Sequence, residues 1–155
     1  GDNTAHNMVD SFWRVVLRGG YCTHGETYID EPETKRPIWW AHGGQLFGES
    51  HKRIDFLKKI IEDNDFKYFK PMATDGPHWE LAVGSNQDGS KVLAYVGDNQ
   101  PGFEIFNFLP ENTEYTVKLI DTWNMTIEDF PKEINSTTFF KVPVINYKAF
   151  LLLRK

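Results

Sequence analysis

The sequence predicts an α+β chain made of a helical first part and an all-β second part. Amphipathic helical periods occur only before about residue 64, and after about residue 65 short β-rich runs alternate with turn residues. The length of 155 residues is enough for one domain, or for a small domain joined to a piece of another.

Two helices are predicted in the first part. The first begins at a cap on Asn3 or Thr4 and ends at the glycine pair 19–20, and the second begins at a Ser50 cap and ends at Asn64. The predicted apolar face of the first helix contains Met8, Phe12, Val15 and Val16. That of the second contains Ile54, Leu57 and Ile61.

Between these helices, residues 21–28 are rich in β-forming residues and predict a buried strand. Its C-terminal end carries His24 and Glu26, and residues 29–48 follow as a long irregular loop. A single strand needs pairing partners on both edges to form a stable sheet. We therefore expect residues 1–64 to be the tail of a larger α/β domain.

The second part predicts an antiparallel sandwich or barrel, because many short strands are separated by turns. A glycine stands in the turn 86–90, where a hairpin needs positive φ. The predicted strands are 79–85, 91–97, 102–108, 114–123, 137–142 and 147–154.

Composition argues against several kinds of partner. The formal net charge is −5 and no basic run is present, which argues against a nucleic-acid partner. The longest apolar run, 149–153, is too short to cross a bilayer, so no membrane partner is expected. Cys22 is a single cysteine and cannot form an internal disulfide. No cofactor is expected, and the absence of a signal peptide in this sequence predicts a cytoplasmic protein unless a signal lies upstream.

Residues 19–50 hold the candidate functional residues. Indole rings beside short polar groups and glycines suit a surface that stacks on a sugar ring and binds its hydroxyls. The predicted substrate-binding residues are His24, Glu26, Trp39, Trp40 and His42.

Each of these residues also has a structural interpretation. Glu26 either binds a sugar hydroxyl or ties the long loop to the strand end through backbone N–H groups. His24 is either a hydrogen-bond donor in the pocket or a structural imidazole. Trp39 and Trp40 cannot both point the same way in an extended chain, so one is expected to stack on sugar. His24, Glu26, His42, Glu49 and His51 offer imidazole and carboxylate ligands that zinc accepts, but no pair has helical i, i+4 spacing, so no metal site is predicted.

Several strings carry a family resemblance. They are MVDSFW at 8–13, GGYCTHGETY at 19–28, WW at 39–40, GES at 48–50 and IDTWNMT at 120–126. Together they resemble the C-terminal region of bacterial glycoside hydrolases of the apiosidase-like family, which have a (β/α)8 barrel followed by a β-domain. The resemblance implies that residues 1–64 are the C-terminal portion of the barrel, with its last helices and strand eight. Residues 65–155 would be an immunoglobulin-like β-sandwich.

The resemblance also implies a function. The two catalytic carboxylates of such barrels lie on strands four and seven, which would precede Gly1, so no catalytic residue is expected in this chain. We expect the chain to complete the barrel and to supply part of a pocket for an oligosaccharide or polysaccharide. Its partners would be the upstream barrel and, because an isolated piece has open strand edges, a second copy in a homo-dimer.

Two other functions stay open. The β-sandwich could be a non-catalytic carbohydrate-binding module that presents Tyr95, Phe103 or Trp123 to a glycan. It could also be a purely structural domain that covers the barrel.

Overall fold

The structure is a computed structural model that describes residues 3–26, 28–31, 33–34, 36–38, 42–73 and 81–155. It is a mixed structure with two helices and mostly antiparallel sheets in the described part of the chain, as predicted at that level. The helices are α1 (Ala5–Leu17) and α2 (Ser50–Asp63). The strands are β1 (Tyr28–Ile29), β2 (Pro37–Ile38), β3 (Gln45–Leu46), β4 (Lys70–Pro71), β5 (Ala82–Ser85), β6 (Lys91–Gly97), β7 (Phe103–Ile105), β8 (Tyr115–Asp121), β9 (Thr126–Asp129), β10 (Phe139–Lys141) and β11 (Lys148–Arg154).

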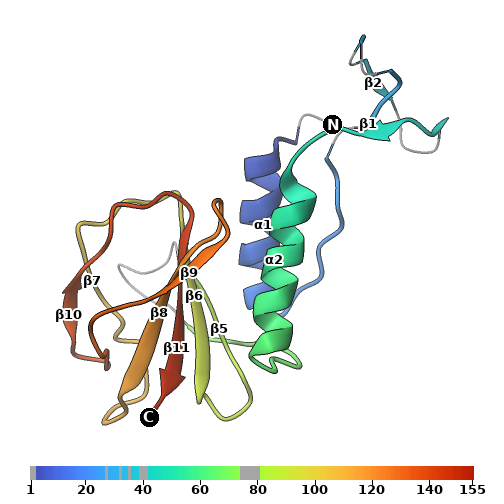
Figure 1. Ribbon diagram of the computed structural model, residues 1–155. Coiled ribbons are helices and arrows are strands. Elements are labelled where there is room, and N and C mark those ends of the chain that lie inside the picture. Colours follow the sequence, from blue (N-terminus) through green and yellow to red (C-terminus); the bar gives the residue numbers. More distant parts are fainter. Residues whose placement is uncertain (1–2, 27, 32, 35, 39–41, 74–80) are drawn as a thin grey trace.

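The main body has three layers, with a six-stranded sheet between a two-stranded sheet and the two helices (Figure 1). The six strands have the order β4-β5-β6-β11-β8-β9, and every neighbouring pair is antiparallel. Each of the six predicted strands contains one observed strand, namely β5, β6, β7, β8, β10 and β11 in chain order. Sequence reasoning missed β4 and β9, because β4 is very short and all four residues of β9 are exposed and so show no alternation.

One face of the six-stranded sheet packs against β7 and β10. Val92, Ala94 and Val96 of β6 lie on this face. Phe106 and Phe140 meet Phe150 of β11 in edge-to-face contacts, with ring centroids 5.5 and 5.8 Å away. A second sheet of two strands, β7 and β10, therefore covers this face of the six-stranded sheet.

The other face of the sheet packs against α1 and α2. Leu93 and Tyr95 of β6 point to this side, and the Trp13 ring stacks on the Tyr95 ring with centroids 5.3 Å apart. The buried residues of α1 are Met8, Val9, Trp13 and Leu17. The face predicted from the sequence was rotated from this one, because Trp13 was left out and sets the orientation of the helix.

The predicted helix ends are largely confirmed. Thr4 caps α1 by accepting a hydrogen bond from Asn7 N at 3.2 Å, and Asn64 is the C-cap of α2. Ser50 is the first helical residue and not the cap, which is Glu49. The Ser50 hydroxyl does not cap the helix and instead contacts Glu26 and His24.

The sequence predicts a strand over residues 21–28, but in the described chain only Tyr28 of that range lies in a strand. Residues 21–26 belong to no strand, and Tyr21 is fully exposed. Tyr28 and Ile29 do form a strand, β1, but it pairs with β2 and β3. The reason is that no strand in the described chain lies beside residues 21–26 to accept their backbone hydrogen bonds.

Residues 20–25 nevertheless run back along α1. A Cβ on Gly20 would meet Val15, near the C-terminal end of the helix, and one on Gly25 would meet Asn3 and Met8 at its N-terminal end. Figure 1 shows this blue segment rising from the lower end of α1 towards the start of α2. The order is therefore helix, antiparallel extended segment, helix.

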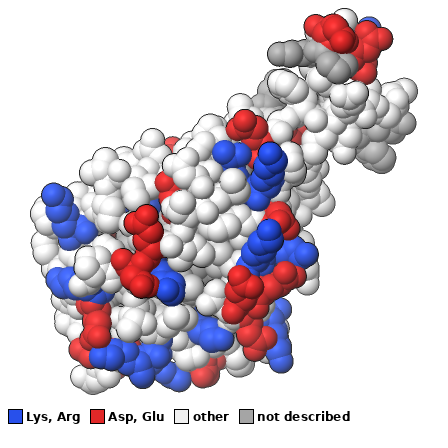
Figure 2. All heavy atoms as spheres, viewed as in Figure 1, with Lys and Arg blue, Asp and Glu red and all other residues white. Residues whose placement is uncertain are grey.

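A small arm formed by β1, β2 and β3 projects from the body beside the start of α2 (Figure 1). Asp30 and Arg36 form an ion pair in it at 2.7 Å, and acidic side chains gather at its tip in Figure 2. On the face drawn there, basic and acidic side chains are interspersed over the body. Neither described helix is long and apolar enough to span a membrane.

Candidate functional site

The site begins with the Glu26 carboxylate, which is buried at the first turn of α2. Only 6% of Glu26 is exposed. Its two oxygens accept hydrogen bonds from Glu49 N at 3.1 Å and from Ser50 N at 3.1 Å, and a third, very short one comes from Ser50 Oγ. A carboxylate at this position satisfies helix N–H groups that have no partner inside the helix, and it lies at the favourable end of the helix dipole.

These hydrogen bonds keep Glu26 ionised. Burial by itself raises the pKa of the Glu26 carboxyl. The hydrogen bonds from the Ser50 hydroxyl, from the backbone N–H groups of Ser50 and Glu49, and from His24 outweigh burial and hold the pKa below its ordinary value. Glu26 is therefore a carboxylate at neutral pH.

Gly48 makes room for this carboxylate. Its φ is +150°, and a Cβ built on it would lie 1.8 Å from Glu26 Oε1. No side chain fits at that position without displacing Glu26. The GES string at 48–50 therefore provides the space, the cap residue and the hydroxyl that receive Glu26.

His24 lies against the same two groups. Its Nε2 is 2.9 Å from Ser50 Oγ and 3.4 Å from Glu26 Oε2. The His24 side chain is 28% exposed, while that of Glu26 is almost fully covered. The imidazole therefore forms the solvent-facing side of a cluster whose interior is Ser50 and Glu26.

The structure thus brings together two of the five predicted site residues and adds Ser50, which sequence reasoning took for a helix cap. His42 lies exposed in the arm, and Trp39 and Trp40 lie outside the described residues. Within the described residues, no three His, Cys, Asp or Glu side chains are grouped as metal ligands.

The aromatic residues named for glycan binding have different surroundings. Tyr95 is fully buried. The Trp123 ring is stacked on His6, with centroids 3.5 Å apart, and Arg53 Cζ lies 3.8 Å from its centroid. Two groups this close must occupy opposite faces of the indole, so Trp123, in the turn between β8 and β9, contacts both helices.

Of the three aromatic residues named for glycan binding, Phe103 is the one whose ring lies exposed on the surface, on β7. It is 56% exposed and stacks on Phe139, which is 61% exposed, with ring centroids 5.0 Å apart and planes at 12°. The pair spans β7 and β10 and forms an apolar patch on the outer sheet.

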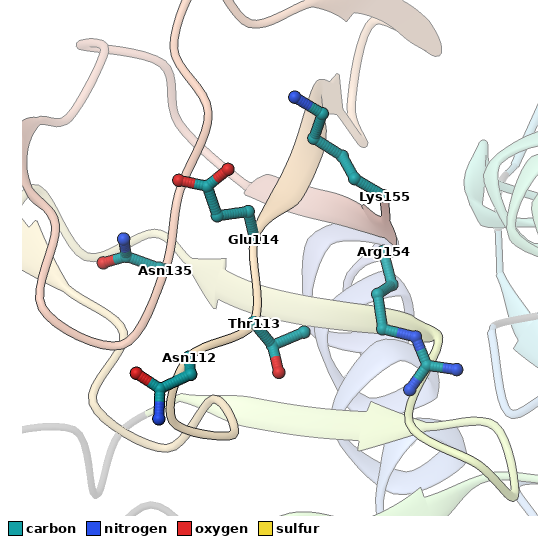
Figure 3. Close-up of a pocket in the computed structure, with 6 residues that line it drawn as sticks. All are labelled: Asn112, Thr113, Glu114, Asn135, Arg154 and Lys155. Atoms are coloured by element: carbon teal, nitrogen blue, oxygen red, sulfur yellow. The ribbon is translucent and has the colours of Figure 1, made fainter.

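A polar hollow opens at the end of β11 (Figure 3), where Arg154 and Lys155 point to different sides. Arg154 pairs with Asp88 at 3.3 Å and Lys155 with Glu133 at 2.9 Å, so both cations already have anionic partners. The hollow is lined by Asn112, Thr113, Glu114, Asn135, Arg154 and Lys155.

Comparison with known proteins gives one family match and several structural ones. Residues 79–153 match the family described as "Domain of unknown function (DUF5605)". A crystal structure of a protein described as a putative glycoside hydrolase from Bacteroides vulgatus is 26% identical, with a TM-score of 0.74 over 100% of this chain and 33% of that one.

The chain resembles glycoside hydrolases. Two further solved structures agree in fold. One is a glycoside hydrolase family 5 protein from Bacteroides vulgatus, with 12% identity and a TM-score of 0.64 over 96% of this chain and 36% of that one. The other is described as "Glycoside hydrolase" and has 10% identity and a TM-score of 0.62 over 97% of this chain and 37% of that one. No curated protein matches the sequence. The chain spans about a third of the length of the relatives it resembles, and the resemblance predicted from the sequence is confirmed.

Proposed function

We propose that this chain is the C-terminal part of a glycoside hydrolase, in which it completes the catalytic (β/α)8 barrel and supplies part of the sugar pocket. The observation that carries the proposal is the match of 100% of this chain, at 26% identity, to 33% of the chain described as a "putative glycoside hydrolase". The catalytic carboxylates would belong to the upstream part, which would be the chain's main protein partner.

The arrangement of the first part supports this proposal. The two helices have an antiparallel segment between them, which is the order of a helix–strand–helix unit of a barrel. A barrel strand pairs with a parallel neighbour on each side. Residues 21–25 make no backbone–backbone hydrogen bond within the described chain, so both of their edges are open for such neighbours.

The position of the cluster also supports the proposal. Barrel active sites open at the C-terminal ends of the strands, and His24 and Glu26 lie at the C-terminal end of the segment in question. We assign His24 to contact with sugar and Glu26 to holding the loop. Trp39, Trp40 and His42, in the loop that follows, keep their proposed role as sugar contacts.

The test compares this chain with a protein extended upstream to include the whole proposed barrel. Both are assayed for binding and hydrolysis with a panel of plant and bacterial oligosaccharides. We expect only the extended protein to cleave, and we expect His24→Ala in it to lower kcat/KM. His51→Ala is the matched control, because His51 is a neighbouring exposed histidine on α2. Equal loss in both variants, or hydrolysis by the short chain alone, would contradict the proposal.

The second candidate function is a non-catalytic carbohydrate-binding module, favoured by the exposed Phe103 and Phe139 pair. Stacking of aromatic rings on sugar requires such an exposed face. If this function holds, Phe103→Ala should abolish retention of the short chain on a polysaccharide column. Tyr68→Ala, which removes another exposed ring, should leave retention unchanged.

A further inference from the structure

The protons of the cluster formed by Glu26, Ser50 and His24 can be assigned from its geometry. Glu26 is an ionised acceptor that receives two backbone N–H groups. Ser50 Oγ contacts Glu26 Oε2, and because an ionised carboxylate can only accept, the hydroxyl must donate in this contact. A serine hydroxyl has one proton, and here that proton is given to Glu26.

The contact with His24 then has only one possible donor. Towards the ring, Ser50 Oγ offers lone pairs alone, so the proton in the 2.9 Å contact must come from His24 Nε2. Glu26 Oε2, at 3.4 Å from the same nitrogen, is a further acceptor on that side. The neutral ring is therefore protonated on Nε2 and carries a lone pair on Nδ1.

We propose that Ser50 and Glu26 hold His24 in the Nε2–H tautomer so that Nδ1 accepts a hydrogen bond from a saccharide hydroxyl. The ring is 28% exposed, and Nδ1 has no partner among the described residues. Ser50 and Glu26 are positioning residues in this arrangement, because they touch the ring and not the sugar. The identity of the hydroxyl donor rests on the proposed function.

This role is the reverse of the donor role expected for His24 from the sequence. A hydrogen-bond acceptor selects for a ligand O–H or N–H and disfavours a ligand that offers only ether or carbonyl oxygens. Saccharide hydroxyls meet this requirement.

The first experiment measures the tautomer directly in the 155-residue chain. Long-range ¹H–¹⁵N correlation spectra at about pH 8, where imidazoles are ordinarily neutral, distinguish protonated from unprotonated ring nitrogens. The His24 signals are assigned by their loss in His24→Gln. We expect Nε2 to carry the proton in the wild-type chain. In Ser50→Ala we expect a mixture of tautomers, with the His51 signals, from an adjacent exposed ring, unchanged.

The second experiment measures which nitrogen the saccharide uses. The side-chain amide oxygen of asparagine is separated from Cβ by the same number of bonds as Nδ1 of histidine. The amide group of glutamine reaches one bond further, as Nε2 of histidine does. In the extended enzyme, His24→Asn should retain saccharide affinity within about threefold, because its amide oxygen replaces the Nδ1 acceptor. His24→Gln should weaken binding about tenfold, because it reproduces only the contact with Ser50.

The outcomes separate the inference from the proposed function. A proton on Nδ1 of His24, or a larger loss of affinity in His24→Asn than in His24→Gln, overturns the inference even if the extended enzyme cleaves sugars. A shift of the Nδ1 signal on adding Zn²⁺ alone, with none on adding saccharide to an active enzyme, also overturns it. An extended protein that neither binds nor cleaves any saccharide overturns the proposed function, and with it the ligand named here.

Discussion

At the residue scale, two buried charged groups, Glu26 and Lys148, each have several hydrogen-bond partners. Glu26 accepts several hydrogen bonds at the start of α2. Lys148, which is fully buried, donates from Nζ to Asn99 O, Gln100 Oε1 and Ile145 O at 2.9, 3.1 and 2.7 Å. Such groups make the structure sensitive to single changes, because removing one member leaves the others without a partner.

The Gly48→Ala substitution tests the close approach to Glu26. We expect it to lower the free energy of unfolding by about 3 kcal/mol, because the new Cβ would overlap the carboxylate. Urea unfolding followed by fluorescence measures this. The control is Gly43→Ala, where φ is +84° but nothing lies within 4 Å, so its cost reflects backbone strain alone. Equal losses in the two variants would show that the carboxylate does not occupy this position.

The Lys148→Met substitution tests the buried ammonium. It removes the ammonium donor from three oxygen acceptors, of which Ile145 O keeps a hydrogen bond from Gln100 Nε2, so we expect a loss of about 2 kcal/mol in the free energy of unfolding. Lys141→Met, at an exposed position on β10, should change it by less than about 0.5 kcal/mol. A stabilised Lys148→Met variant would contradict this account of the three contacts.

Composition alone could indicate His24 and Glu26, because two histidines, four glutamates and two adjacent tryptophans lie together within residues 19–50. It could not indicate Ser50. A serine at the start of a helix is ordinarily a cap, and its actual use depends on a contact across 24 positions of sequence.

At the element scale, the sequence predicts a helix or strand correctly when the residues that determine it are neighbours in the sequence. The ends of α1 and α2 follow from Thr4 and Asn64, because capping involves neighbours in sequence. A strand depends on partners that sequence neighbours do not supply. Residues 21–26 have the composition of a strand, and the described chain provides nothing for them to pair with.

The attachment of α2 to Glu26 should make stability depend on pH. The pKa of Glu26 is lowered in the folded state, so its contribution is present at neutral pH, above the unfolded pKa. It is lost as the pH falls through the folded pKa. We therefore expect Glu26→Gln to be less stable than wild type at pH 7, with the difference shrinking from about pH 5 downwards.

Thermal unfolding of the two proteins across this range checks the expectation. Glu62→Gln is the control, because Glu62 lies on the same helix with a 59% exposed side chain. If the difference between wild type and Glu26→Gln stayed constant down to pH 3, the carboxylate would not be ionised within the cluster.

At the scale of the whole molecule, the sequence predicted an antiparallel, β-rich second part but not the packing of α1 and α2 on one face of the six-stranded sheet. A signal was present, because residues 92–96 and 149–153 are continuously apolar, which is typical of strands buried on both faces. The division into domains at residue 64 stays a prediction, since α1 and α2 share a core with the sheet.

The isolated chain should associate through residues 21–25. The outer strands of the main sheet are protected, with Pro71 on β4 and acidic residues at the end of β9, whereas residues 21–25 carry no Lys, Glu or Pro. Light scattering should show dimers that increase with concentration. Thr23→Lys should reduce them, and Ile127→Lys on β9 should not. A monomer at every concentration would contradict this expectation.

The strand order has a consequence for how the protein is made. β11 follows every other described strand in sequence, yet it lies between β6 and β8 in the sheet. While the ribosome is still adding residues 148–154, those two strands have no common neighbour and the apolar faces of the sheet cannot close. The full sheet can therefore assemble only after this region is translated, and until then the edges of β6 and β8 that face β11 stay unpaired, a state in which strand edges are prone to aggregation.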